Sequence, residues 1–95
     1  MVLEHTVLFR LWPGADPDEA IDVIDRARPD DPGVLSWRVS RSVDDRKGIV
    51  LLERAIFADR STFERFLETP AHRSAGRYMA QCSDWLVADV ELGQP

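Results

Sequence analysis

The sequence predicts an α+β fold, and three observations support this prediction. Apolar and polar residues alternate with a period of two in several segments, which is typical of strands. Between these segments, apolar residues recur at helical spacing behind helix-start signatures. The elements follow the order strand, helix, strand, strand, helix, strand. This is the order of the split βαβ, ferredoxin-like arrangement, so we expect a four-stranded antiparallel sheet.

The first strand is expected over residues 3–12, and a helix follows it. One face of this strand is apolar except for a histidine, and comprises Leu3, His5, Val7, Phe9 and Leu11. Pro13-Gly14 ends the strand. Residues 16–19, Asp-Pro-Asp-Glu, then supply a cap, a first-turn proline and an acid at the third helical position. The helix should therefore begin here and stop near Arg28, before the turn at residues 29–33.

The second and third strands are expected over residues 34–43 and 49–57, joined by a hairpin turn at 44–48. In the second strand, one side should carry Leu35, Trp37, Val39 and Val43. The third strand begins apolar on both faces, so it needs cover on both sides. The predicted helices are enough to cover only one face of the sheet. A second copy of the chain is the simplest source of the missing layer, and we expect a homodimer.

A helix carrying Phe63, Phe66 and Leu67 on one face should begin at Asp59 or Ser61. The chain changes direction at Thr69-Pro70, where threonine suits the N-cap and proline suits the first helical position of the next helix. The next helix is expected to place five residues at core spacing: Ala71, Ala75, Tyr78, Met79 and Cys82. The last strand is expected over residues 85–92.

Length and charge exclude several classes of protein. The 95 residues fit one domain, spanning residues 1–95. The net charge is −5 and the 12 Lys and Arg residues are scattered, which argues against nucleic-acid binding. No segment approaches the ~20 apolar residues that span a bilayer, so we expect no membrane association and a cytoplasmic location. The lone Cys82 has no disulfide partner, which argues against an oxidising compartment.

Several short segments together resemble one known family. They are Glu4-His5-Thr6-Val7-Leu8-Phe9-Arg10-Leu11, Pro13-Gly14, Pro32-Gly33-Val34, Phe57-Ala58-Asp59, Pro70-Ala71-His72 and Asp84-Trp85-Leu86-Val87-Ala88-Asp89. In this order they resemble the stress-responsive α/β-barrel (Dabb) domain family over nearly the whole chain. The resemblance implies a ferredoxin-like protomer whose sheet packs against that of a twin, giving a dimeric α+β barrel. It also implies a cavity between the sheet and the helices of each protomer.

The chain is more distantly similar to polyketide cyclases of the olivetolic acid type, which carry out a cofactor-free aldol condensation. The first-strand histidine of these cyclases matches His5, and their catalytic base matches His72. Their tyrosine, six residues before the base, corresponds to Phe66, which has no hydroxyl group to donate. The resemblance therefore implies a histidine base and no cofactor, without the usual phenol partner.

His72 is the candidate catalytic base from the residues themselves. At the third helical position, the positive end of the helix dipole disfavours protonation of the ring and leaves a neutral imidazole. Alternatively, the ring only bonds to a neighbouring backbone group. His5 is the second candidate, as a polar partner in the pocket or as a satisfied core histidine. Two histidines without a nearby Cys or acidic cluster at ligand spacing give little support for a metal site.

Six further residues are candidates for substrate binding: Phe9, Trp37, Phe63, Phe66, Tyr78 and Asp89. The aromatic residues should belong mainly to the core, and some of them should line any cavity. Asp89 is expected to orient a histidine or a polar substrate group, or else to be exposed or paired with an arginine. Tyr78 lies six residues beyond His72 on one helix, so their side chains should point apart. Trp12 and Trp85 are expected near strand ends or the dimer seam.

Three functions are compatible with these features. The first is a cofactor-free cyclase, lyase or isomerase acting on an aromatic or polyketide-like small molecule, with His72 as general base. The second is a dimer that binds a small ligand or supports a stress response without chemistry, which Phe66 favours. The third is a cofactor-free monooxygenase of the dimeric α+β barrel type. Its asparagine, tryptophan and histidine constellation cannot be assembled here, because the chain has no asparagine.

Overall fold

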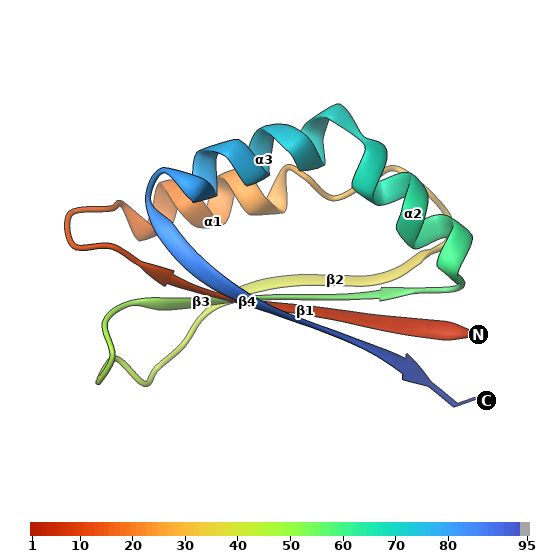
Figure 1. Cartoon of the computed structure of the whole chain (residues 1–95), viewed down its shortest axis with the longest axis horizontal. Coiled ribbons are helices and arrows are strands. Elements are labelled where there is room, and N and C mark those ends of the chain that lie inside the picture. The colour runs from red at the N-terminus through yellow and green to blue at the C-terminus, as the bar shows by residue number, and fades with distance from the viewer. Residues whose placement is uncertain (94–95) are drawn as a thin grey trace.

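A four-stranded sheet carries three helices on one face and has no helix on the other (Figure 1). The computed structural model describes residues 1–93. The elements are β1 (Val2–Leu11), α1 (Pro17–Asp25), β2 (Val34–Arg41), β3 (Val50–Phe57), α2 (Arg60–Glu68), α3 (Pro70–Ala80) and β4 (Ser83–Leu92). The ferredoxin-like α+β fold expected from the sequence is confirmed. No helix in residues 1–93 is both long and apolar enough to cross a bilayer.

The strand order is β2-β3-β1-β4, and every neighbouring pair is antiparallel. The central strands β1 and β3 bury alternate side chains beneath the helices. His5 lies in the middle of this buried face, opposite Ala55 on one side and Asp89 on the other. The register therefore brings a histidine of β1 next to a carboxylate of β4.

Side-chain caps start each helix. Asp16 accepts hydrogen bonds from the backbone amides of Asp18 and Glu19, so α1 begins where the sequence predicts. Asp59, rather than Ser61, caps α2 by accepting from the Thr62 amide. The N-cap of α3 is Thr69, whose hydroxyl oxygen lies 3.1 Å from the amide nitrogen of His72. All three caps are residues that the sequence singled out.

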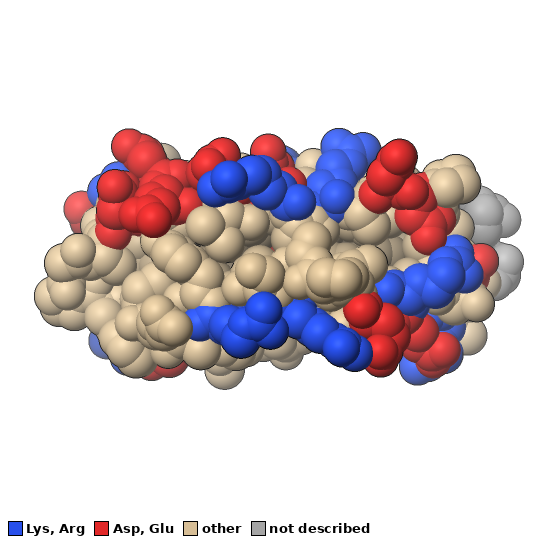
Figure 2. Space-filling model, turned by 90° about the horizontal axis from the view of Figure 1, so that it is seen from above, with Lys and Arg blue, Asp and Glu red and all other residues tan. Residues whose placement is uncertain are grey.

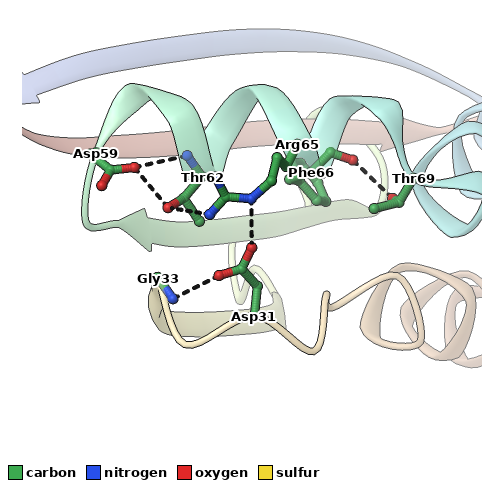
Figure 3. Close-up of polar contacts among 7 residues, drawn as sticks. All are labelled: Asp31, Gly33, Asp59, Thr62, Arg65, Phe66 and Thr69. Carbon is green, nitrogen blue, oxygen red and sulfur yellow. Dashed lines mark hydrogen bonds and ion pairs between the residues drawn. The ribbon is translucent and has the colours of Figure 1, made fainter.

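A polar network joins α2 to the loop before β2 (Figure 3). One carboxylate oxygen of Asp31 accepts from the Gly33 amide, and the other accepts from the Arg65 guanidinium. Arg65 also donates to the Thr62 hydroxyl, which in turn donates to the cap residue Asp59. This network fixes the end of α2 that faces β2 and so helps to position the aromatic residues of α2.

The faces of β2 differ from the expected pattern. A β-bulge lies between Val34 and Ser36, so Val34, rather than Leu35, points into the core, and Leu35 is exposed. Val43 lies beyond the end of the strand and is 102% exposed. The prediction that Leu35 and Val43 share the apolar face of Trp37 and Val39 was therefore wrong. Ala71, expected in the core, is exposed on α3.

The two faces of β4 differ in apolar character. Trp85, Val87 and Asp89 share the helix side of the sheet with His5, while Leu86 and Val90 lie on the opposite face. Leu86 is 75% exposed, and the same outer face carries the exposed Leu8 of β1. The more apolar face of β4 is thus turned away from the helices.

Seen from above the helices, charged side chains form two bands with an uncharged strip between them (Figure 2). Part of this charge comes from α1, which carries the acidic residues Asp18, Glu19, Asp22 and Asp25. The helical side therefore carries its charge along both edges of an uncharged strip.

Candidate functional site

A cavity of about 350 Å³ lies between the sheet and the helices. Residues of β1, β3, β4 and all three helical regions form its wall: His5, Val7, Phe9, Ile24, Ala27, Glu53, Phe63, Leu67, His72, Ala75, Gly76, Met79, Trp85, Val87 and Asp89. Two of the β4 residues, Trp85 and Val87, are exposed. The cavity is therefore open to solvent along β4, and its wall is mainly apolar.

His5 is held between two carboxylates in this cavity. Its Nε2 atom lies 3.0 Å from Oε2 of Glu53, and its Nδ1 atom lies 2.5 Å from Oδ1 of Asp89. Both contacts are hydrogen bonds only when both ring nitrogens carry a proton. Glu53 is almost fully buried, whereas the Asp89 side chain is 36% exposed. The geometry therefore favours a charged imidazolium that bridges an interior and a peripheral carboxylate.

The electrostatics agree with this protonation state. Burial by itself lowers the pKa of His5, but the hydrogen bonds and negative charges of Glu53 and Asp89 outweigh it, so the pKa is raised. The rings of Phe57, Phe63 and Phe66 surround the imidazole at centroid distances of 6.3, 5.3 and 6.0 Å. Aromatic rings at this distance favour a cation.

Glu53 is a site residue that the sequence reasoning missed. Its position in β3 did carry a signal, because it is the one charged residue on the buried face formed by Leu51, Glu53, Ala55 and Phe57. A carboxylate is buried in this way only when it is paired. The strand register supplies the partner, since Glu53 lies opposite Val7, two residues along β1 from His5.

His72 lines the same cavity from α3 but has a different environment. Its Nδ1 atom is buried and has no hydrogen-bond partner within the described residues. The imidazole is part of the cavity wall and so lies within reach of an occupant. The Phe66 ring contacts the imidazole edge to face, with a centroid distance of 4.5 Å. The helix cap and this aromatic contact hold the ring in place.

His72 is neutral at pH 7. Burial lowers its pKa more than the Leu67 backbone and the Glu53 charge raise it, and the positive charges of His5 and Arg73 lower it further. The two histidines therefore differ in protonation because they differ in partners. The partners of His5 favour its protonated form, and the burial of His72 favours a neutral form able to accept a proton.

The structure brings five of the eight predicted site residues to the cavity wall: His5, His72, Phe9, Phe63 and Asp89. The other three, Trp37, Phe66 and Tyr78, do not line it. Phe66 is buried behind His72, and Trp37 packs against Phe66 with an unpaired buried indole nitrogen. Tyr78 packs against the core cluster around Ile24 and Met79. Trp85, predicted near a strand end or the dimer seam, belongs to the wall.

Within residues 1–93, no group of three or more His, Cys, Asp or Glu side chains is arranged to hold a metal ion. The contacts of His5 explain why its cluster is unsuited. Both ring nitrogens point at carboxylates, so neither presents a lone pair to a cation.

The sequence pattern of the stress-responsive A/B barrel domain matches residues 3–92. The chain belongs to the stress-responsive A/B barrel domain family. No curated protein matches it. The family resemblance inferred from the segments around His5 and His72 is therefore confirmed.

Solved structures of the same fold include several types of protein. A dimeric ferredoxin-like protein of unknown function from Thermobifida fusca has a TM-score of 0.84 and 18% identity, covering 97% of this chain and 92% of its own. The cofactor-independent oxygenase SnoaB from Streptomyces nogalater has a TM-score of 0.80 and 18% identity, covering 99% and 95%. A hydroxynitrile lyase from Passiflora edulis has a TM-score of 0.78 and 14% identity, also covering 99% and 95%. At these identities the likeness shows the fold alone.

Proposed function

We propose that this A/B barrel domain is a cofactor-free lyase in which His72 is the general base, acting on an aromatic or polyketide-like molecule. One observation carries the proposal. The His72 imidazole, whose pKa is lowered by burial, lies on the wall of an apolar cavity. Both ring nitrogens of the other histidine, His5, are taken up by carboxylates, so it presents no free nitrogen to act as a base.

The reaction needs only one proton acceptor. His72 Nε2 takes the proton of a substrate hydroxyl, and the oxygen electrons form a carbonyl group. The bond from the hydroxylated carbon to its neighbour breaks, and the leaving group carries away the electron pair. It then takes the proton back from His72. No electron is gained or lost, so no redox cofactor is required, and aldol cyclisation is the same chemistry in reverse.

Two features support a lyase over a cyclase with a phenol donor. Phe66, at the position of the cyclase tyrosine, has no hydroxyl and does not line the cavity. A hydroxynitrile lyase from Passiflora edulis has the same fold, and its name describes a lyase that acts on a hydroxynitrile. Fold likeness at this identity allows the activity without assigning it.

The test is a His72→Gln substitution, which removes the base and keeps a side chain of similar size. We expect kcat/KM toward aromatic hydroxynitriles, or toward a linear polyketide thioester, to fall about 10²- to 10⁴-fold, the usual contribution of general base catalysis. Arg77→Gln is the matched control, because Arg77 is exposed on the same helix and does not line the cavity. Full turnover by the His72 variant would remove the base assignment.

The second candidate function is a dimer that binds a small ligand without chemistry. The missing hydroxyl at Phe66 favours it, since the site then lacks the donor used by the similar cyclases. Binding of an aromatic molecule by the wild-type chain, without turnover of either substrate class, would support this alternative.

We also propose that two copies of the chain pair through the outer face of the sheet. This face presents Leu8 of β1 and Leu86 of β4 to solvent, and the half-buried Leu52 and Ile56 of β3 lie on the other side of β1. An apolar face of this kind is expected to be covered. The dimeric ferredoxin-like protein of Thermobifida fusca and a dimeric protein from Bacteroides fragilis share this fold, which supports a homodimer.

A further inference from the structure

We infer that the cavity selects uncharged aromatic molecules that carry a hydroxyl group and rejects aromatic carboxylates. The inference deepens the proposed function and rests on the same cavity. It concerns equilibrium binding, which can be measured whether or not the bound molecule reacts.

The charges on the wall exclude an anion. Two carboxylates, Glu53 and Asp89, line the cavity together with one imidazolium, His5, and the wall contains no Lys or Arg. The carboxylates therefore outnumber the imidazole that pairs with them at the polar end. A carboxylate in the cavity would meet like charges in a poorly solvated space and would find no free cation to pair with.

The hydrogen-bonding groups favour a donor. Both N–H groups of His5 are used by Glu53 Oε2 and Asp89 Oδ1. The groups left for an occupant are the second oxygen of each carboxylate and the unprotonated ring nitrogen of His72, and all of these are acceptors. A ligand hydroxyl pairs with one of them, whereas a ligand with acceptors alone leaves them unpaired at a cost.

The remaining wall favours a flat apolar ring. Phe9 and Phe63 lie on one side of the polar end, and Trp85 stands at the open edge, 5.9 Å from Phe9 between ring centroids. A volume of about 350 Å³ is at the small end of the range for ligand sites, so a compact ring system fits better than a long chain.

The experiment compares three probes with one ring system: 2-naphthol, 2-methoxynaphthalene and 2-naphthoate. Binding to the wild-type chain at pH 7 is measured by calorimetry and by quenching of tryptophan fluorescence. We expect 2-naphthol to bind about tenfold more tightly than the ether, which lacks the donor, and 2-naphthoate to bind more weakly still. Equal affinity for naphthol and its ether, or naphthoate binding as tightly as naphthol, would overturn the inference.

Substitution of the buried carboxylate tests whether its negative charge causes the preference for naphthol over naphthoate. Glu53→Gln keeps the shape of the side chain and removes its charge, so the preference for naphthol over naphthoate should fall about tenfold. Glu64→Gln is the matched control, because Glu64 is exposed on α2 and does not line the cavity. Should the Glu53 variant fail to fold, Asp89→Asn tests the same charge at the partly exposed edge. An unchanged preference in the folded variant would contradict the inference.

The outcomes separate this inference from the proposed function. Naphthol binding with the expected preference, in a chain that turns over no substrate, would contradict only the lyase proposal. A substrate carboxylate that is bound tightly and cleaved with His72 as the base would contradict only the ligand preference.

Discussion

His5 couples its charge state to the stability of the fold. Its pKa is raised in the folded chain because Glu53 and Asp89 stabilise the proton more than burial opposes it. A raised histidine pKa contributes stability that is complete below the unfolded value, about 6.5, and is lost as the pH rises through the folded pKa. His72 acts in the opposite direction, because its pKa is lowered. The contribution of His72 therefore changes below pH 6.5 and that of His5 above it.

The His72→Gln variant exposes the effect of His5 alone. We expect its free energy of unfolding to decrease between pH 6 and pH 9, measured by urea denaturation at one fixed protein concentration. A His5→Gln/His72→Gln double variant should lose this dependence. If the free energy of unfolding of the His72→Gln variant is constant or rises over this range, the pKa of His5 is not raised in the folded chain.

The candidate site was predictable residue by residue only in part. The alternation of β1 placed His5 on the buried face, and the cap at Thr69 placed His72 in the first turn of α3. The charge of His5 was not predictable, because it depends on the pairing of β1 with both β3 and β4. Glu53 and Asp89 lie 48 and 84 residues further along the chain, and only the sheet register brings them together.

At the scale of elements, contact between Gly33 and α2 limits what the loop before β2 accepts. A Cβ atom at residue 33 would lie 2.3 Å from Oγ1 and 2.7 Å from Cγ2 of Thr62. Thr62 is 2% exposed and bonded to Asp59, so it has little freedom to move away. The glycine is required for close approach of the loop to the helix.

Gly33→Ala should therefore lower the free energy of unfolding by about 1–3 kcal/mol, the usual cost of forcing extra volume into a packed site. Gly76→Ala is the matched control: the added methyl group meets nothing within 4 Å, and replacing a glycine inside a helix should stabilise by about 0.5–1 kcal/mol. Chemical denaturation of both variants gives the comparison. Equal stabilities for the two variants would mean that α2 shifts freely against the loop.

The sequence predicted the elements better than their faces. Capping residues and prolines are local signals, and they placed the starts of α1 and α3 correctly. The bulge in β2 has no such signal, because it arises from pairing with β3 and reverses the expected positions of Val34 and Leu35. A shift of one residue was enough to move Leu35 from the predicted core to the surface.

For the whole molecule, the uncovered face of the sheet determines assembly. The apolar stretch of β3 led us to expect a second layer, and the structure leaves the outer face without any helix. Leu86→Asp places a charge on the most exposed leucine of the proposed interface and should shift the chain from dimer to monomer. Sedimentation at several concentrations measures the change.

Val43→Asp is the control for this substitution. Val43 is also exposed, but it lies beyond the end of β2, away from Leu86. This variant should remain dimeric. A wild-type chain that is monomeric at high concentration, or a Leu86 variant that dimerises normally, would contradict pairing through the outer face.

Thr69 belongs to two helices at once, and this limits how the chain can change in length. Its hydroxyl oxygen lies 2.8 Å from the Phe66 carbonyl at the end of α2, and the same atom accepts from the His72 amide at the start of α3. A single inserted residue after Thr69 would turn His72 by about 100° around its helix. Among related sequences, insertions and deletions should therefore accumulate in the hairpin between β2 and β3. They should be absent at the α2–α3 junction, even where the residue types at that junction vary.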